Sequence, residues 1–326
     1  MKNSKIKGIA LDESLKRLVW HEFKPKCGEN TALVPIKYSA LNHRDVWISK
    51  GKYPGIKPFI TLGSDGLVEQ EGHRKVINPG LHWGNNENFQ SSRFEVLGMP
   101  SHGTFAEAIE IEQSKLHDTP RHLSDEEAAA LPLAGVTAYR CLLKRCQLKP
   151  KEKVLITGIG GGVASMALQY AIAMDADVIV TSGSLEKIDM ALKLGAKAGY
   201  NYREEDWHNA LISDFGGVDV VIDSAGGEGF ANLVSIVNPG GRIGFYGGGL
   251  GNWTFVNPQK LFWRQISILG STMGSDQDFR EMLDFVSLHN IRPVVDQVFN
   301  ISDYDEAFRY MSSAAQFGKI VFNNLG

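Results

Sequence analysis

The sequence predicts an α/β protein with a β-rich domain and a doubly wound parallel-sheet domain. Its 326 residues exceed the length at which a single hydrophobic core stays efficient, so two domains are expected. Residues up to about 122 carry short strand patterns separated by Gly, Pro and Asn. After Ser124, apolar strand candidates alternate with stretches of helical length, an order typical of a parallel sheet.

In the β-rich part we expect strands at 31–38, 67–69, 76–78 and 106–111. Ser124 and Glu127 then form the start signal of a helix, with a cap residue followed three positions later by Glu. Strands are expected beyond it at 154–157, 178–181, 218–223 and 242–246, with helices at 163–174, 185–194 and 207–215. The last fifty residues predict a helix (278–289), a strand (294–299), a short helix (303–312) and a final strand (318–322).

Composition excludes several classes of function. The net charge of −3 and the pI near 6.3 argue against a surface for nucleic acid or anionic membrane. We expect a cytoplasmic protein, because the N-terminus has no continuous apolar segment and no run of eighteen apolar residues follows. Three scattered cysteines, Cys27, Cys141 and Cys146, indicate neither a disulfide framework nor a zinc knuckle.

The most informative segment is VLITGIGGGVA at 154–164, an apolar strand, a glycine turn and a helix start. This arrangement sets a dinucleotide pyrophosphate against backbone N–H groups and the positive end of a helix. Gly158, Gly161 and Ala164 have the spacing that permits the turn, the close approach of phosphate and tight helix packing. The predicted phosphate-binding residues are Gly158, Gly160, Gly161, Gly162 and Val163.

The next strand indicates which dinucleotide binds. About twenty residues after the glycines, an NAD site usually carries an acidic residue, but this chain has Ser182. Ser182, Gly183, Ser184 and Lys187 suit a 2′-phosphate, so NADPH is the predicted cofactor. The alternative is an ordinary polar turn in which Ser184 caps the following helix.

Eight segments in register resemble the medium-chain dehydrogenase/reductase superfamily, and within it the zinc-independent quinone oxidoreductase branch. They are ALNHRDVW at 40–47, GSDG at 63–66, GTFAE at 103–107, LAGVTAY at 133–139, the glycine turn, NYREED at 201–206, DVVIDSAGG at 219–227 and GKIV at 318–321. The resemblance implies a GroES-like catalytic domain (1–122 and 276–326) around a Rossmann cofactor domain (123–275), with the active site in the cleft between them. It also implies a homodimer joined through an edge strand within 265–271, because an uncovered edge is a liability.

The same resemblance predicts that no zinc is bound. Asn42, Ser64 and Leu133 stand where zinc-dependent relatives place their ligands, and they cannot form a tetrahedral N/S site. The hydroxyl and histidine of the proton relay fall at Arg44 and Trp47, and 78–93 lacks the four cysteines of the structural lobe. Without a Lewis acid the chemistry favours quinones and α,β-unsaturated carbonyls, because their conjugation spreads the charge that develops on oxygen.

The resemblance also assigns individual residues, and each has a structural alternative. Asn42 and Tyr53 match catalytic positions, but they could be a turn residue and a packing aromatic. Contacts with the cofactor are implied for His43, Thr137, Tyr202 and Lys319, of which His43 could be a surface residue and Thr137 a core residue. Tyr246 and Gly247 end a strand at the sheet's carboxyl edge, where nucleotides bind.

The predicted function is therefore NADPH-dependent reduction of a small apolar quinone or enone. Two alternatives stay open from the sequence. One is an alcohol dehydrogenase-like enzyme with a non-metal proton donor, and the other is a nucleotide-binding protein without catalysis, since fold does not determine function.

Overall fold

The computed structural model describes residues 5–25, 28, 30–254 and 256–325, so Cys27 lies outside the described residues. The chain forms two compact units: residues 1–136 with 274–326, and residues 137–273. Among the described residues, none of the helices combines the length and apolar composition that a membrane span requires.

The boundary between the units differs from the expected one at residue 122. Helix α2 (Asp125–Ala130) starts where the Ser124 signal predicts, with Ser124 Oγ accepting from Glu127 N, but it belongs to the first unit. Its Asp125 carboxylate pairs with Arg74 at 2.7 Å, and Glu127 pairs with Arg292 at 2.7 Å. The change in composition at Ser124 therefore marks a helix that covers the β-rich unit, and the second unit begins within α3 (Pro132–Tyr139).

The first unit is rich in β-strands, as the sequence predicts, and its sheets are mainly antiparallel. Its main sheet has the order β16-β17-β3-β4-β5-β9, with β8 paired to β3, and only the β16–β17 pair is parallel. The strands are β3 (Thr31–Leu41), β4 (Asp65–Gln70), β5 (His73–Ile77), β8 (Ala108–Glu112), β9 (Leu116–Asp118), β16 (Val295–Asn300) and β17 (Lys319–Asn323). Two smaller sheets join β1 (Ile6–Leu11) to β2 (Leu18–Phe23) and β6 (Gly80–Leu81) to β7 (Glu95–Val96).

Among its described residues, the first unit also contains helices and short helical turns, besides the start of α3. They are α1 (His43–Ser49), α2, α9 (Asp276–Leu288) and α10 (Tyr304–Ser312), with 3₁₀ turns at Gln113–Lys115 and Ile301–Asp303. The sequence did not indicate α1 or the β1–β2 hairpin. Both lie against one apolar cluster, so their formation depends on partners that are distant in the sequence.

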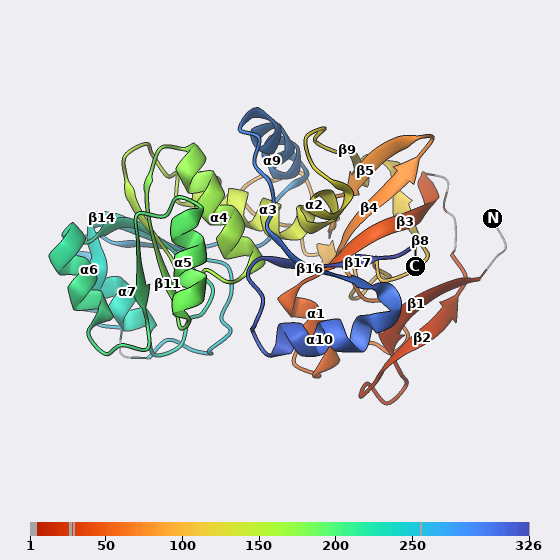
Figure 1. The fold of residues 1–326 in the computed structure, drawn as a ribbon, viewed down its shortest axis with the longest axis horizontal. Helices are drawn as coiled ribbons and strands as arrows, with labels where there is room; N and C mark the ends of the chain where they lie inside the picture. Colours follow the sequence, from red (N-terminus) through yellow and green to blue (C-terminus); the bar gives the residue numbers. More distant parts are fainter. Residues whose placement is uncertain (1–4, 26–27, 29, 255, 326) are drawn as a thin grey trace. The chain divides into compact units, whose positions relative to one another are not determined.

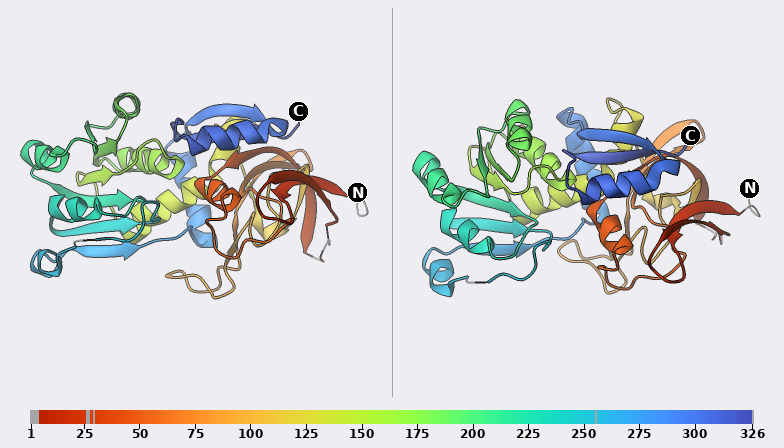
Figure 2. Two further views of the ribbon diagram at one scale, coloured as in Figure 1. Left: turned by 90° about the horizontal axis from the view of Figure 1, so that it is seen from below. Right: turned by 60° about the horizontal axis from the view of Figure 1, so that its bottom comes forward.

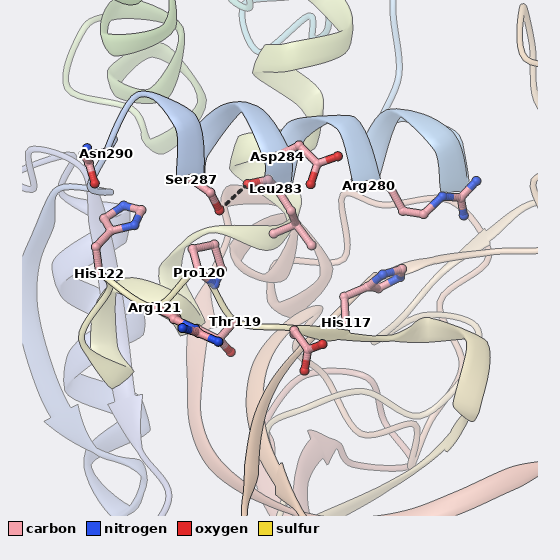
Figure 3. Close-up of a pocket in the computed structure, with 11 residues that line it drawn as sticks. His117, Thr119, Pro120, Arg121, His122, Arg280, Leu283, Asp284, Ser287 and Asn290 are labelled. Carbon is pink, nitrogen blue, oxygen red and sulfur yellow. Dashed lines mark hydrogen bonds between the residues drawn. The ribbon is translucent and has the colours of Figure 1, made fainter.

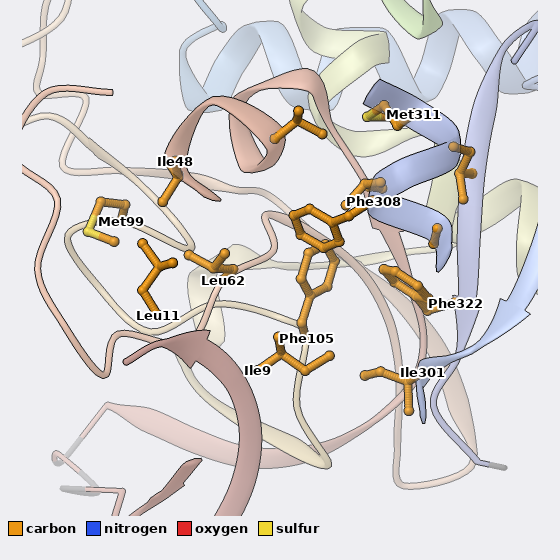
Figure 4. Packing of buried hydrophobic residues seen from close by; sticks show 14 residues of the cluster. Ile9, Leu11, Ile48, Leu62, Met99, Phe105, Ile301, Phe308, Met311 and Phe322 are labelled. Atoms are coloured by element: carbon orange, nitrogen blue, oxygen red, sulfur yellow. The ribbon is translucent and has the colours of Figure 1, made fainter. Parts of the chain in front are cut away.

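That cluster fixes the elements that carry the candidate site (Figure 4). Phe105 is fully buried and meets the rings of Phe308 and Phe322 edge-on, with centroids 6.2 and 5.1 Å away. Ile48 of α1 and Ile320 of β17 belong to the same cluster. Because one core holds α1 and β17, side chains 277 residues apart in the sequence meet at one point.

The second unit is a six-stranded parallel sheet of order β12-β11-β10-β13-β14-β15, the doubly wound arrangement expected from the sequence (Figures 1 and 2). The strands are β10 (Lys153–Ile156), β11 (Asp177–Ser182), β12 (Ala198–Asn201), β13 (Val218–Asp223), β14 (Val237–Phe245) and β15 (Ser267–Gly270). The helices are α4 (Gly162–Ala173), α5 (Leu185–Lys193), α6 (Trp207–Phe215), α7 (Phe230–Ile236) and α8 (Pro258–Trp263), and a π-helical turn (Arg140–Arg145) follows α3.

Candidate functional site

The turn between β10 and α4 has the geometry of an anion-binding loop. Gly158 adopts φ +62°, a left-handed conformation that favours glycine, and nothing lies within 4 Å of a Cβ built there. The first helical residues of α4 are Gly162, Val163 and Ala164, whose amides have no intrahelical acceptor. The cap residue, Gly161, has no side chain to bond them. Gly158 thus faces open space beside a positive helix end, an arrangement that fits a pyrophosphate.

The carboxyl ends of β10 and β13 meet beside this turn, where the strand order reverses. Thr157 Oγ1 donates to Asp223 Oδ1 at 2.6 Å, and the Gly226 amide donates to Asp223 Oδ2 at 2.9 Å. Asp223 is 1% exposed. Its Oδ1 joins the ends of β10 and β13, and its Oδ2 holds the turn that follows β13. In open parallel sheets this reversal is the place where nucleotides bind.

The turn after β11 is where the sequence predicts the 2′-phosphate. Ser182 Oγ accepts from the Ser184 amide at 3.1 Å, and Ser184 Oγ accepts from the Lys187 amide at 3.4 Å as the cap of α5. The alternative of a capped polar turn therefore describes the local geometry correctly. It does not exclude phosphate binding, since each hydroxyl keeps its proton to donate.

Sequence reasoning missed Arg203 at this turn. Strand β12 runs parallel to β11 with Ser182 opposite Asn201, so the residues after β12 reach the same place. A Cβ built at Gly183 would lie 2.8 Å from both Tyr202 Oη and Arg203 Nε. Tyr202 is half exposed and Arg203 is exposed. The sequence does show a cation, Arg203, directly after Tyr202 in the NYREED segment. Its place beside Gly183 could not be predicted, because it depends on the pairing of β12 with β11.

At the carboxyl end of β14, Tyr246 and Gly247 line a cavity of about 590 Å³ together with Trp253 and Gly270. Burial raises the pKa of the Tyr246 phenol well above its ordinary value, so it stays protonated. Thr137 is buried, and its hydroxyl lies 3.9 Å from Met273 Sδ. The alternative interpretation of Thr137 as a core residue describes this position, and its contact with the cofactor stays a prediction.

In the first unit, Asn42, Asp65 and Lys319 form a buried charged cluster. Lys319 Nζ lies 2.7 Å from Asp65 Oδ2 and 2.6 Å from Asn42 Oδ1, and Asn42 Nδ2 donates to Asp65 Oδ2 at 2.8 Å. The Leu133 amide donates to Asp65 Oδ1 at 2.7 Å. Asn42 is 7% exposed, and both charged residues are 3% exposed or less. The cluster joins β3, β4, β17 and the start of α3 through a buried, hydrogen-bonded ion pair.

The structure places Lys319 in the core of the first unit, and its contact with the cofactor stays a prediction. The ammonium group, predicted to face the cofactor pyrophosphate, is buried and held by a carboxylate and an amide oxygen. A lysine that neutralises Asp65 in the core cannot move to a phosphate without leaving a buried carboxylate unpaired. Asn42 is likewise committed to this cluster. His43 lies at the first position of α1, exposed and with its ring 5.1 Å from the Trp47 ring.

Arg44 and Tyr53 form a second polar group beside the cluster. Arg44 Nη1 donates to Ser64 Oγ at 2.7 Å and to the Leu97 carbonyl at 2.6 Å, and Nη2 donates to the Met99 carbonyl at 3.2 Å. Its Nε and Nη2 each lie 3.4 Å from Tyr53 Oη, and the guanidinium carbon is 5.0 Å from the ring centroid. Both side chains are half-buried. Tyr53 is therefore held by a cation, while its ring packs on the apolar cluster.

The positions that resemble metal ligands carry no metal-binding set. Asn42 bonds Lys319 and Asp65, Ser64 bonds Arg44 and the Leu97 carbonyl, and Leu133 supplies only its backbone amide. Across the described part of the chain, no three His, Cys, Asp or Glu side chains gather as metal ligands would. The residues present at these positions therefore do not fit a zinc ion.

Asp45, next to Arg44, is fully buried. Its Oδ2 accepts from the Asn42 amide at 2.9 Å, whereas Oδ1 has no hydrogen-bond partner among the described residues. Desolvation raises the pKa of Asp45 from 3.8 to about 6, although Arg44 and the Asn42 amide oppose this shift. The folded protein thus holds a proton here that the unfolded chain releases at lower pH.

This proton makes stability depend on pH in a defined direction. Because the folded pKa lies above the unfolded one, the free energy of unfolding should fall as pH rises from about 4 to about 6. Asp45→Asn should remove this fall, so its stability relative to wild type should rise by on the order of 3 kcal/mol between pH 4 and pH 7. Denaturant titrations at both pH values test this. Asp278→Asn, which alters the similar cap of α9, is the control, and parallel pH profiles for wild type and Asp45→Asn would contradict it.

A further hollow of about 600 Å³ lies between α9 and residues 117–122 (Figure 3). His117, Arg121, Arg280 and Asp284 are among its lining residues, and none of the predicted site residues is. Desolvation and the Arg280 cation lower the pKa of His117, which keeps the ring neutral near pH 7. The hollow is therefore separate from the residues that the sequence and the geometry assign to the site.

A doubly wound parallel sheet with a glycine turn at its first strand end is typical of the cofactor domains of nucleotide-dependent oxidoreductases. Residues 162–287 match the family model described as zinc-binding dehydrogenase. The zinc-type alcohol dehydrogenase-like protein YogA of Leptosphaeria maculans is 32% identical over 91% of this chain and 92% of its own. Quinone oxidoreductase-like protein 2 of Bos taurus is 27% identical over 96% and 91%. A crystal structure of an NAD-dependent alcohol dehydrogenase is 33% identical, with a TM-score of 0.90 over 97% of this chain and 99% of that one.

The chain belongs to the medium-chain dehydrogenase/reductase superfamily. Its fold, a β-rich catalytic unit with a Rossmann-type unit, is confirmed by these relatives. The relatives indicate an oxidoreductase, and the fold of the superfamily favours a nicotinamide cofactor.

Proposed function

We propose that the protein reduces quinones or α,β-unsaturated carbonyl compounds with NADPH and without a metal. The observation that carries this proposal is the set of residues at the metal-ligand positions, where Asn42, Ser64 and Leu133 are bonded to protein groups. Reduction of a simple ketone needs a strong Lewis acid or a positioned acid, whereas a conjugated acceptor disperses the charge that develops on its oxygen. When bound, the reduced nicotinamide supplies the hydride.

The residues of the chain would divide the remaining tasks. The amides at the start of α4 would hold the pyrophosphate, and Ser182, Ser184, Lys187 and Arg203 would recognise the 2′-phosphate. Tyr53 would donate a hydrogen bond or a proton to the carbonyl oxygen of the acceptor. The name of the bovine relative supports a quinone as acceptor, while the names of the other two relatives keep alcohol oxidation as the second candidate.

One assay separates these functions. The purified protein is incubated with NADPH or NADH and a panel of quinones and enones, and with NADP⁺ or NAD⁺ and a panel of alcohols, each with and without a chelator. We expect NADPH oxidation with quinones and enones that persists in chelator, and no stoichiometric zinc by elemental analysis. Chelator-sensitive alcohol oxidation would support the second candidate. Nucleotide binding without turnover on any acceptor would indicate a non-catalytic protein.

The cofactor preference is tested by reversing charge at the β11 turn. Lys187→Glu should weaken NADPH binding by on the order of 2–3 kcal/mol, because it removes a charged hydrogen bond and adds repulsion to the 2′-phosphate. Arg203→Ala should also weaken NADPH binding, and both variants should change NADH binding far less. Calorimetric titration measures both nucleotides, and Lys193→Glu, exposed on the last turn of α5, is the matched control. Equal losses for both nucleotides would show that these cations do not recognise the phosphate.

We also propose a homodimer that pairs through β15, the edge strand of the parallel sheet. Helix α8 precedes this strand and leaves Phe262 and Trp263 66% and 79% exposed. Light scattering at micromolar concentration should give twice the 35.9 kDa of one chain. Trp263→Glu should shift the mass toward a single chain, and a monomeric mass for the wild type would count against pairing.

A further inference from the structure

We infer that Arg44 is a positioning residue that turns Tyr53 into a proton donor and stabilises the phenolate it leaves behind. The inference rests on the proposed function and concerns which group makes a metal-free site acidic enough to reduce an enone. The resemblance to the superfamily assigns no role to Arg44. It occupies the position at which zinc-dependent relatives have the hydroxyl of their proton relay.

The first argument is the direction of the hydrogen bonds between Arg44 and Tyr53. A guanidinium has only donors, so the contacts at 3.4 Å from Nε and Nη2 make Tyr53 Oη the acceptor. Two N–H groups on one phenolic oxygen leave its own O–H directed elsewhere. Among the described residues, Tyr53 donates that proton to no acceptor. Arg44 thus sets the polarity of the phenol, and its proton remains available to an acceptor from solution.

The second argument is the way in which the other hydrogen bonds of Arg44 hold its guanidinium in place. Its other edge bonds Ser64 Oγ and the carbonyls of Leu97 and Met99, three neutral acceptors. Among the described residues, no carboxylate forms an ion pair with this half-buried guanidinium. The neighbouring buried carboxyl of Asp45 interacts electrostatically with Arg44, but it bonds the Asn42 amide and not the guanidinium. Neutral acceptors thus hold the guanidinium beside Tyr53, an arrangement that stabilises negative charge developing there.

The proton balance follows from this arrangement. NADPH would supply a hydride to the β-carbon of the enone and become NADP⁺, and the C=C electron pair would shift toward the carbonyl so that charge develops on its oxygen. As this happens, the Tyr53 O–H bond breaks and the proton forms a new O–H bond on that oxygen. The electron pair stays on Tyr53 Oη, toward which the two Arg44 N–H groups already point. Water then returns a proton to the phenolate, and the enol product becomes the ketone. A quinone needs less of this help, because its reduced form disperses charge over two oxygens.

A double-mutant cycle with Arg44→Lys and Tyr53→Phe tests the inference. Lysine keeps the charge but cannot present two N–H groups to one oxygen. Arg44→Lys alone should lower kcat for enones by about tenfold or more, with much smaller changes in quinone turnover and in KM. In the Tyr53→Phe background, Arg44→Lys should change enone turnover by less than twofold. Equal losses in both backgrounds would overturn the inference, because they would mean that Arg44 acts independently of Tyr53.

A measurement on the cofactor-free protein makes the result independent of turnover. With tyrosines labelled at ¹³Cζ, the Tyr53 resonance is assigned by its loss in Tyr53→Phe. It should move in Arg44→Lys and stay in place in Lys52→Gln, a control that removes a nearby exposed charge. If the wild type reduces neither quinones nor enones, the proposed function fails. If the Tyr53 resonance does not move in Arg44→Lys, the present inference fails, whether or not the protein is active.

Discussion

Tyr53→Phe is expected to slow enone reduction by roughly tenfold to a thousandfold, the range associated with losing a general acid or an oxyanion donor. The substitution removes one oxygen and leaves the ring, which packs against the apolar cluster of the first unit. NADPH affinity should be unchanged, and quinone reduction should fall much less, because solvent can protonate the delocalised product. Steady-state rates with one enone and one quinone at saturating NADPH measure the difference.

Tyr304→Phe is the matched control for this prediction. Tyr304 packs on the same apolar cluster, and within the described part of the chain its hydroxyl bonds only the Leu18 carbonyl, at 3.4 Å. It should reduce both acceptors at the wild-type rate. If the Tyr53→Phe variant also reduces enones at the wild-type rate, Tyr53 only lines the site and water supplies the proton.

Lys319→Met should lower the free energy of unfolding by about 3–5 kcal/mol, the cost of leaving a buried carboxylate without its cation. Methionine retains the volume of the side chain, so the loss reports the charge of Asp65 and the unmatched oxygen of Asn42. Urea denaturation at pH 7 measures it. A lysine that served only the cofactor would instead give a variant of nearly normal stability and weakened NADPH binding.

Lys75→Met is the matched control for that experiment. Lys75 pairs with Asp118 at the same distance of 2.7 Å, but the carboxylate is 84% exposed. Solvent screens such a pair, so its loss should cost about 1 kcal/mol or less. Similar losses for Lys75→Met and Lys319→Met would contradict the interpretation of Lys319 as a buried structural ion.

The second unit was largely predictable from the sequence, because its signals are local. A glycine turn between an apolar strand and a helix identifies β10 and α4, and the expected bounds of β13 and α6 match the structure. Parallel strands alternate with helices along the chain, so the order of elements determines most of the topology. The position of Ser184 as a helix cap was also readable, since a cap bonds residues three positions away.

The first unit was less predictable, because its parts depend on partners far along the chain. Helix α1 has only seven residues, too few for a stable isolated helix, and it forms where Ile48 enters the Phe105 cluster. Helix α2 carries a clear start signal, but the sequence does not say which unit it covers. Its packing on β3 and β4, with Ala128, Ala129 and Ala130 fully buried, decides that, and the ion pairs with Arg74 and Arg292 add to it.

The sequence by itself determined the superfamily, the doubly wound cofactor unit and the residues at the metal-ligand positions, because these depend on residue type and spacing. Only the tertiary structure decided what those residues do. Lys319 turned inward because β17 pairs with β3, which places its ammonium beside Asp65. Arg203 lies at the turn after β11 because β12 pairs with β11. Arg44 lies beside Tyr53 because α1 packs on the apolar cluster. Strand pairing and core packing fix such contacts, and neither is encoded within the few residues that a motif spans.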